Sequence, residues 1–270
     1  MSAQNLSDTS SWLPLDGLAP GFDENKAELT TDLAGYSFRS IRADGREIDH
    51  VFTETTLSLS AVGVDGSTRE VNFEAFSVAD GLYYVQFQDE ARPSEAVSFF
   101  LDQTNGVGLI VNTIIGEASA GVTAVTQKFT TFTVGGHGNP SLVPSPTNEL
   151  IGRRVYWRYS RAHAYEHVYL SPQWYTWHCL SGPERGLADT EEHTTYELRP
   201  GIFVFCWREK VIPCASVTVA DHRDFDNLRS HGVLFGLDES GENTVHFTFG
   251  SHGKVLSTSN YPEDLDPRRP

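Results

Sequence analysis

Three aromatic side chains and one carboxylate occupy every second position from 203 to 209. The surrounding residues 201–213 read Gly-Ile-Phe-Val-Phe-Cys-Trp-Arg-Glu-Lys-Val-Ile-Pro. In a strand, side chains at alternate positions share a face. One face would therefore present Phe203, Phe205, Trp207 and Glu209. Large apolar rings exclude water, so they should raise the pKa of the Glu209 carboxyl and make it a candidate catalytic acid or base. The alternative is a strand-end glutamate that reaches solvent or pairs with Lys210 or Arg208.

The same pattern occurs earlier in the chain. Residues 81–93 read Gly-Leu-Tyr-Tyr-Val-Gln-Phe-Gln-Asp-Glu-Ala-Arg-Pro and align with residues 201–213 without a gap, 120 positions apart. Asp89 takes the place of Glu209 in this alignment. Three further matches occur in the same order: residues 33–35 with 150–152, 49–52 with 166–169, and 132–138 with 247–253. Matches in this order predict a tandem duplication.

Short apolar or alternating runs, separated by turn-forming pairs, fill both halves of the chain. Strands at intervals of about ten residues predict antiparallel sheets, each closing into a barrel of about eight strands. The sequence therefore predicts an all-β protein with two tandem antiparallel β-barrels. The predicted regions are an N-terminal tail and strap (1–32), an N-terminal barrel (33–138), a linker (139–148), a C-terminal barrel (149–257) and a C-terminal tail (258–270).

The N-terminal region has two parts. Residues 1–11 are polar and serine-rich, which predicts a loose tail. Residues 12–22 combine turn chemistry with a few apolar side chains, which is typical of a lid or strap rather than of a regular element.

The chain is acidic, with 36 Asp and Glu against 20 Lys and Arg and a net charge of -16. Such a surface repels phosphate backbones and anionic lipid headgroups, so neither nucleic acid nor a membrane is expected as a partner. We find no run of about 18 apolar residues and no basic head before an apolar stretch at the N-terminus. Cys179, Cys206 and Cys214 form no Cys-x-x-Cys pair, which predicts a reduced, cytoplasmic protein without a disulfide scaffold or zinc ribbon.

Aromatic residues gather in the second half, which holds Trp157, Trp174, Trp177 and Trp207 of the five tryptophans. If these segments are strands, Tyr159 and Trp157 lie on the same face of one strand, and Tyr165 and His167 lie on the same face of another. Such a cluster beside Glu209 suits a cavity that grips an aromatic or carboxylated molecule, and the alternative is a packed aromatic core. His167 matches His50 in the repeat, so a shared structural role stands beside a role as base or hydrogen-bond donor.

Cofactor and metal motifs are missing from the sequence. The ten histidines form no His-x-His or His-Glu-x-x-His pattern and have no cysteine-rich partner. Neither a phosphate loop, a Gly-x-Gly-x-x-Gly fingerprint nor a Gly-x-Ser-x-Gly elbow is present. We therefore expect no metal and no organic cofactor, and hydrolase, dehydrogenase and kinase functions find no support.

Three long motifs point to a known family. Residues 12–26 read Trp-Leu-Pro-Leu-Asp-Gly-Leu-Ala-Pro-Gly-Phe-Asp-Glu-Asn-Lys, residues 175–190 read Tyr-Thr-Trp-His-Cys-Leu-Ser-Gly-Pro-Glu-Arg-Gly-Leu-Ala-Asp-Thr, and residues 207–210 read Trp-Arg-Glu-Lys. Together they resemble the MoaF family, the molybdenum-cofactor-biosynthesis-protein-F-like proteins, over about residues 12–256. The resemblance implies two tandem lipocalin-like (calycin) barrels. Nothing in the chain resembles a pterin or molybdate site.

The second half is also weakly similar to the bacterial phenolic acid decarboxylases, which are single lipocalin-like barrels. In that family two tyrosines hold the substrate carboxylate, and a glutamate and an arginine act at the phenol end. The resemblance places Tyr159 at one tyrosine and Glu209 at the glutamate. Trp157 replaces the other tyrosine, and Arg185 lies two residues from the arginine's position. These departures disfavour decarboxylation itself but leave a cofactor-free acid–base cavity.

The leading functional hypothesis is a cofactor-independent lyase, isomerase or cyclase acting on a small aromatic or polyunsaturated carbonyl-bearing molecule in the C-terminal barrel. Glu209 would move the proton, Tyr159 and Tyr165 would orient the substrate, and Arg185 or His167 would stabilise developing negative charge. Its predicted substrate-binding residues are Trp157, Tyr165, Trp177, Phe205 and Trp207. The N-terminal barrel, with Asp89 and fewer rings, would be a scaffold or a second wall.

Two other functions remain open. A lipocalin-like binding or carrier protein would use the same cavity for an aromatic or hydrophobic ligand without chemistry. A purely structural duplicate would contain no cavity above about 300 Å³ in either barrel. The chain could also form a homodimer.

Overall fold

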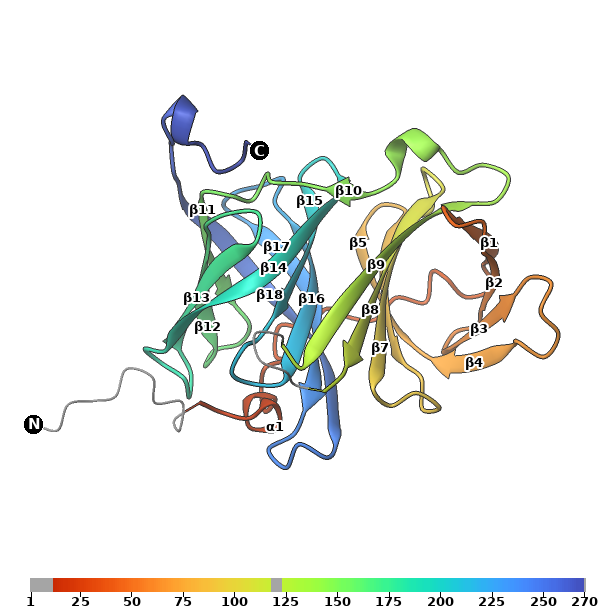
Figure 1. Cartoon of the computed structure of the whole chain (residues 1–270), viewed down its shortest axis with the longest axis horizontal. Helices are drawn as coiled ribbons and strands as arrows, with labels where there is room; N and C mark the ends of the chain where they lie inside the picture. Colours follow the sequence, from red (N-terminus) through yellow and green to blue (C-terminus); the bar gives the residue numbers. More distant parts are fainter. Residues whose placement is uncertain (1–11, 118–122, 270) are drawn as a thin grey trace, which may run out of the picture.

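The computed structural model describes residues 12–117 and 123–269, so the tail predicted for residues 1–11 lies outside the described residues. Two nine-stranded antiparallel sheets lie side by side (Figure 1), which confirms the all-β prediction. Helical structure in the described chain is limited to α1 (Leu15–Leu18) and the 3₁₀ turns η1 (Pro140–Leu142) and η2 (Glu263–Leu265). Within the described residues, no helix is both long and apolar enough to span a membrane.

The first sheet has the strand order β4-β3-β2-β1-β9-β8-β7-β6-β5. Its strands are β1 (Ser37–Arg42), β2 (Glu47–Phe52), β3 (Thr56–Ala61), β4 (Arg69–Asn72), β5 (Glu74–Ala79), β6 (Leu82–Gln88), β7 (Glu95–Asp102), β8 (Val107–Ile115) and β9 (Val125–Val134).

The second sheet has the order β10-β14-β13-β12-β11-β18-β17-β16-β15, and β14 also pairs with β15. Its strands are β10 (Ser145–Pro146), β11 (Arg153–Arg158), β12 (Ala164–Tyr169), β13 (Trp174–Ser181), β14 (Ala188–Arg199), β15 (Ile202–Arg208), β16 (Cys214–Asp221), β17 (Leu228–Leu237) and β18 (Thr244–Thr258). The β14–β15 pairing closes strands β11 to β18 into an eight-stranded barrel, as predicted.

The two sheets follow the same path, because β1 to β3 correspond to β11 to β13 and β6 to β9 correspond to β15 to β18. The single long strand β14 corresponds to β4 and β5 together, which are separated only by Phe73. The two edge strands of the first sheet, β4 and β5, are therefore connected through Phe73 of the main chain and do not pair with each other. The matched glycines Gly35 (φ 77°) and Gly152 (φ 87°) both adopt the left-handed conformation that favours glycine.

Strand β15 lies between two cores, which explains its apolar sequence on both faces. Phe203, Phe205 and Trp207 belong to the core inside the second barrel. Ile202, Val204 and Cys206 belong to a separate core. The alternation predicted for this segment is confirmed, and the face opposite the aromatic residues is also buried.

That separate core joins the two barrels. It combines residues of β5 to β8, such as Phe76 and Phe100, with residues of β15 to β17, such as Val217. A bidentate ion pair spans the same interface, because Arg199 Nε and Nη2 each lie 2.7 Å from an oxygen of the nearly fully buried Asp102 carboxylate. Equivalent faces of the duplicated sheets therefore pack on each other.

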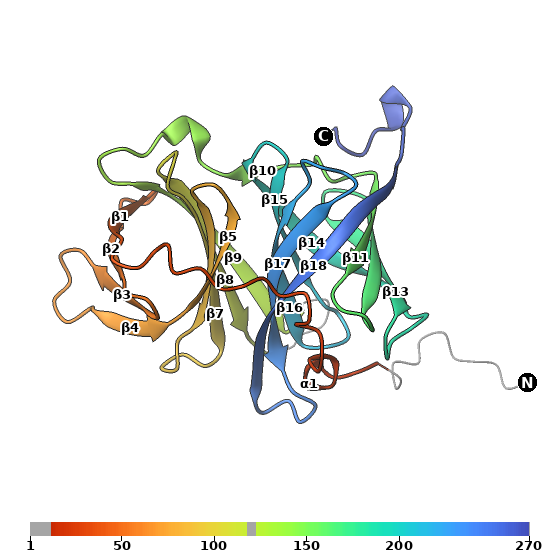
Figure 2. The ribbon, with the colours of Figure 1, turned by 180° about the vertical axis from the view of Figure 1, so that it is seen from behind.

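The N-terminal segment crosses from one barrel to the other (Figure 2). Residues 12–22 pack on the second barrel, where Leu15 and Phe22 are buried in its core. The Asn25 amide donates to the Tyr159 carbonyl at 3.1 Å, and the Thr30 amide donates to the Ala75 carbonyl of β5 at 2.9 Å. We refer to residues 12–22 as the strap.

Candidate active site in the second barrel

A cavity of about 60 Å³ lies inside the second barrel, at the end covered by the strap. Its wall is mostly aromatic and holds two carboxylates. The lining residues are Trp12, Leu15, Leu18, Phe22, Tyr159, Tyr165, His167, Tyr175, Trp177, Glu184, Trp207, Glu209, Ile212, Cys214 and Leu234. The first four of these belong to the strap, so the strap closes the cavity. A space of this size holds a few water molecules, and a larger molecule can enter only if the strap moves.

Glu209 follows β15 and faces this cavity, as the alternation along residues 201–213 predicted. The Trp207 indole Nε1–H donates to Glu209 Oε1 at 3.0 Å, whereas the buried Oε2 has no donor among the described residues. Burial raises the pKa of Glu209 to about 7, although hydrogen bonds with Glu191 and Trp207 act in the opposite direction. Neither Lys210 nor Arg208 pairs with it, since these bases pair with Asp189 and Glu192.

A second carboxyl group lies against Glu209. Glu191 of β14 is completely buried, and its carboxyl group lies within hydrogen-bonding reach of that of Glu209. The Lys210 amide donates to Glu191 Oε2 at 3.1 Å, and Oε1 has no other donor among the described residues. Burial, together with the negative charge of Glu209, raises the pKa of Glu191 to about 10.

Glu209 Oε2 and Glu191 Oε1 can form a hydrogen bond with each other only if one of the two groups keeps a proton, because an ionised carboxylate cannot donate. Two buried carboxyls in contact share a proton in this way in other proteins, and they titrate as a pair. Burial raises the pKa of both groups, so the pair keeps one proton at neutral pH. With that proton on Glu191, Glu209 is a carboxylate that can accept a proton, beside an acid that can supply one.

A third carboxylate comes from the loop after β13. Glu184 is buried, and its Oε2 accepts a hydrogen bond of 2.8 Å from the Tyr165 hydroxyl. Burial raises the pKa of Glu184, which the hydrogen bond from Tyr165 partly offsets. The Tyr165 ring also lines the cavity, so this pair fixes one aromatic wall.

Two further polar atoms of the cavity residues are buried without a protein partner among the described residues. They are His167 Nδ1 and Trp177 Nε1. Burial lowers the pKa of His167 to about 3, so its ring is neutral at physiological pH. Buried polar atoms are rarely left unpaired, so these two atoms offer polar contacts to a molecule in the cavity.

Six of the nine predicted site residues line the cavity: Glu209, Tyr159, His167, Tyr165, Trp177 and Trp207. The Tyr159 ring is stacked on Phe22 of the strap at 4.5 Å. Arg185 does not line the cavity: it is exposed, and its neighbour Glu184 points inward instead. Phe205 packs beneath the cavity, 4.9 Å from the Tyr175 ring.

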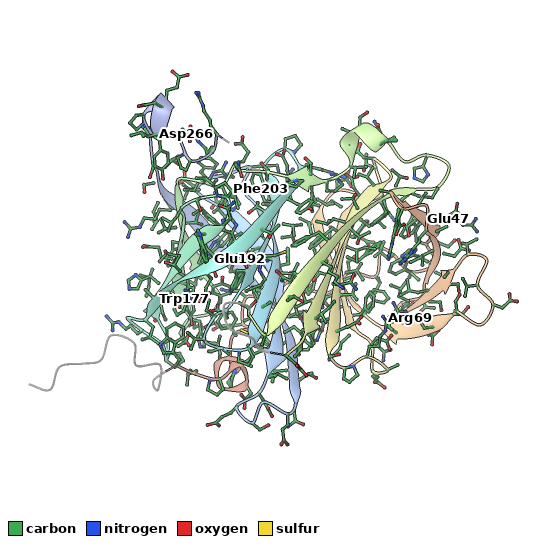
Figure 3. All side chains as sticks on the ribbon, viewed as in Figure 1. Glu47, Arg69, Trp177, Glu192, Phe203 and Asp266 are labelled. Atoms are coloured by element: carbon green, nitrogen blue, oxygen red, sulfur yellow. The ribbon has the colours of Figure 1, made fainter. Side chains whose placement is uncertain are left out.

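Trp157 is also outside the cavity wall. Its ring packs edge-on to His222, which contacts Phe203 toward the end of the barrel opposite Trp177 (Figure 3). Gly253 of β18 lies directly against the indole, and a Cβ at this position would come within 2.4 Å of a ring carbon of Trp157. Trp157 is therefore a packing residue of the barrel core.

Replacing Gly253 with alanine is expected to lower the free energy of unfolding by about 1–3 kcal/mol, because the added methyl group overpacks the core. Denaturant unfolding measures this difference. The control is Gly116→Ala, since a Cβ at Gly116 meets only one atom, at 3.7 Å. Equal stability of the two variants would contradict the close packing described for Trp157.

The fold and this cavity define a class: a duplicated β-barrel protein whose second barrel encloses a carboxyl pair among aromatic rings. The MoaF C-terminal domain family matches residues 144–259, and the MoaF N-terminal domain family matches residues 10–117. The chain belongs to the MoaF family, which confirms the resemblance drawn from its motifs.

One similar protein is Protein MoaF of Klebsiella aerogenes, which is 26% identical over 267 residues, covering 93% of this chain and 98% of that protein. Among solved structures, a "putative beta-lactamase from Burkholderia vietnamiensis" matches with a TM-score of 0.35 and 12% identity, over 42% of this chain and all of that one. This structural likeness is too low to support an argument about function.

Proposed function

We propose that the second barrel is the active site of a cofactor-independent enzyme that moves protons, of the lyase, isomerase or cyclase type. The observation that supports this most strongly is the buried Glu191–Glu209 pair, in which Glu209 lines the mostly aromatic cavity and Glu191 lies against it. A base and an acid in contact can remove a proton from one atom and return it to another. We also propose a cytoplasmic location, in keeping with three buried free cysteines.

In this proposal Glu209 accepts a proton from the substrate. Glu191 either shares that proton with Glu209 or returns its own proton to the substrate. The raised pKa of Glu209 favours both the removal and the return of the proton, since a base that titrates near the working pH can gain and lose a proton readily. The Trp177 indole N–H has no other acceptor among the described residues and could donate to a developing oxyanion. Tyr159 and Tyr165 would orient the substrate, and neutral His167 would provide a further polar contact.

The wall of the cavity sets the substrate class. Aromatic rings predominate around Glu209 in the cavity wall, so the proposed substrate is a small aromatic or polyunsaturated molecule with a carbonyl group whose neighbouring proton can be removed. Entry requires the strap to move, and the T-shaped contact between Trp12 and Trp177 at 5.4 Å must then open. Closure of the strap over a bound substrate would exclude water from the carboxyl pair.

The proposal is tested by incubating the protein with a pool of small metabolites, followed by mass spectrometry, with tryptophan emission recorded in parallel. An enzyme converts at least one compound to a product of altered mass or retention time, and this conversion depends on Glu209. Saturable quenching of the emission without any product would instead identify a carrier protein. Absence of both would contradict the proposal for the compounds in the pool.

A further inference from the structure

The first barrel contains a larger cavity than the second, with a volume of about 290 Å³. It lies at the equivalent end of the repeat, because its lining residues match those of the second cavity through the strand registers. His50 corresponds to His167 and Leu59 corresponds to Trp177. The strap residues pack in the second barrel and not in the core of the first, which leaves this cavity with more space.

The two cavities differ in charge. The position of Tyr159 is occupied by Arg42, and the position of Leu234 is occupied by Asn112. Asp89, the counterpart of Glu209, pairs with Arg69 at 2.8 Å and with Arg92 at 3.5 Å. The ion pairs hold the pKa of Asp89 below its usual range, with the Arg69 hydrogen bond as the largest cause. An acidic site in one repeat is therefore basic in the other.

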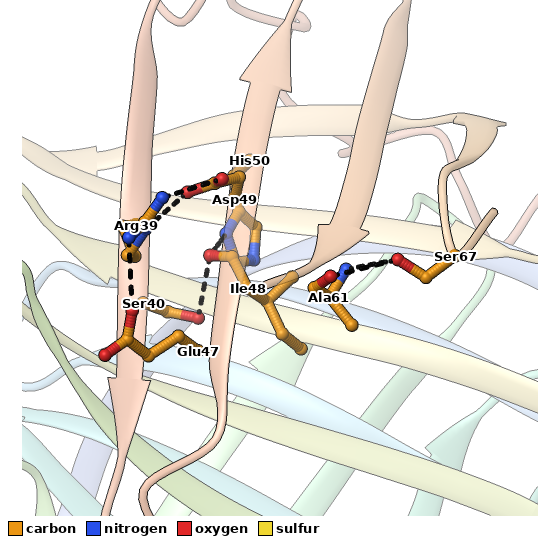
Figure 4. A network of polar contacts seen from close by, with 8 residues as sticks. All are labelled: Arg39, Ser40, Glu47, Ile48, Asp49, His50, Ala61 and Ser67. Carbon is orange, nitrogen blue, oxygen red and sulfur yellow. Dashed lines mark hydrogen bonds and ion pairs between the residues drawn. The ribbon is translucent and has the colours of Figure 1, made fainter. Parts of the chain in front are cut away.

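Arg42 is the one cavity arginine that lacks a carboxylate partner among the described residues. Arg39, on the outer face of the same strand, pairs with Asp49 at 2.7 Å and with Glu47 at 3.2 Å (Figure 4). Arg42 points inward, where its Nε is buried without any hydrogen-bond acceptor in the described chain. Arg42 as a whole is half-buried, but its buried Nε is a cationic donor without a partner, which favours an anionic ligand at this position.

The charge balance of the cavity indicates that its ligand carries a single negative charge. Arg42, Arg69 and Arg92 line it, whereas the carboxylates that pair with these arginines are Asp89 and Glu95. One positive charge therefore remains. The deeper wall is apolar, formed by residues such as Leu57, Leu59, Val97, Phe99 and Ile110.

His50 keeps this wall neutral. Its Nδ1 lies 3.0 Å from the Ile48 carbonyl oxygen (Figure 4), and its ring stacks on Phe38 at 4.4 Å. Burial lowers the pKa of His50 to about 4, so the ring adds no second charge at neutral pH. The cavity thus combines a single cationic donor at one end with apolar surface at the other.

We propose that the first barrel binds a small amphipathic monocarboxylate, whose carboxylate pairs with Arg42 and accepts from the Asn112 amide while its apolar part lies against Leu59 and Phe99. A planar guanidinium suits a carboxylate because two parallel N–H bonds can form. This site is separate from the carboxyl pair of the second barrel, and it needs no chemical step.

Octanoate is a suitable probe, with octanol as its uncharged counterpart. Calorimetric titration of the full chain is expected to show saturable binding of octanoate, and Arg42→Gln should weaken it by about tenfold or more, the effect of losing a hydrogen-bonded charge. Octanol binding should be the same in both proteins. Arg46→Gln is the matched control, because Arg46 lies in the adjacent turn, is exposed and pairs with Asp44. It should bind octanoate like the wild type.

Tryptophan emission locates the ligand, since all five tryptophans lie in the strap or the second half of the chain. Octanoate in the first barrel should leave the emission unchanged. Removal of the unpaired charge should not lower the thermal stability of Arg42→Gln, so weak binding cannot be attributed to misfolding. The proposal is overturned if the wild type shows no saturable octanoate binding, if binding quenches the tryptophans, or if Arg42→Gln and Arg46→Gln bind equally well.

Discussion

Glu209→Gln is expected to lower the turnover of any compound converted in the metabolite pool by about 10²–10⁴-fold, the range for loss of a general acid or base. Glutamine keeps the size of the side chain and its contact with the Trp207 indole, but it cannot accept the proton. Glu191→Gln should cause a loss of similar size, because Glu209 would then lack its proton donor. The measurement is the initial rate of product formation at saturating substrate.

Non-additivity distinguishes a proton-sharing pair from two independent residues. If Glu191 and Glu209 act as a unit, the double variant should be no slower than the slower single variant. The control is Glu192→Gln, on the same strand as Glu191 but with a half-exposed side chain that pairs with Arg208 on the outside of the barrel. Wild-type turnover in Glu209→Gln, or an equal loss in Glu192→Gln, would remove the pair from the mechanism.

The protonated carboxyl should also make the fold less stable in alkaline solution. Glu191 ionises near pH 4.3 in an unfolded chain, whereas burial raises its folded pKa to about 10. The folded state therefore binds one more proton, and its stability falls as pH rises toward the folded pKa. Between pH 7.5 and 9.5 the wild type should lose about 2–3 kcal/mol more unfolding free energy than Glu191→Gln, at about 1.4 kcal/mol per pH unit.

Denaturant titrations at several pH values measure this difference. The range begins at pH 7.5 because burial lowers the pKa of His167 to about 3, and such histidines make stability rise with pH only up to their unfolded pKa of about 6.5. Glu192→Gln should follow the wild-type curve. Parallel curves for the wild type and Glu191→Gln would mean that Glu191 is already ionised in the folded protein.

Much of the fold could be predicted from local patterns. Alternation along residues 201–213 correctly placed Phe205, Trp207 and Glu209 on the interior face, because a strand allows only two faces. The repeat predicted the shared sheet topology, since each matched segment occupies the same place in both sheets. Period-two patterns do not show which outer faces meet, so the core between the barrels was not predicted.

Glu191 was missed although the sequence holds a signal for it. Glu191 and Glu192 are consecutive, and on a barrel strand one of two consecutive side chains must face inward. The counterpart of Glu191 in the first repeat is Val71, so comparison of the halves does not reveal a carboxylate there. Glu184 has no such signal, because it lies in the loop between β13 and β14, where alternation does not apply. The resemblance to the decarboxylases points to its neighbour Arg185 instead.

The size of the second cavity could not be predicted either. The strap was expected from the turn residues between positions 12 and 22, but its turn chemistry does not indicate which barrel it covers. Phe22 and Leu15 fill the space that the barrel alone would leave open. Neither this cavity, at about 60 Å³, nor the cavity of about 290 Å³ in the first barrel exceeds about 300 Å³, the size that would exclude a purely structural duplicate. The proposed function of the second barrel therefore depends on strap movement.

Isotope-edited infrared spectroscopy at pH 8.5, on protein labelled in its glutamate carboxyl carbons, tests most directly whether the carboxyl pair holds a proton. The wild type should show a carbonyl band of a protonated carboxylic acid, which disappears in Glu191→Gln, shifts in Glu209→Gln and is unchanged in Glu192→Gln. A wild-type spectrum that contains only ionised carboxylate bands would contradict the shared proton, and with it the acid–base site proposed for the second barrel.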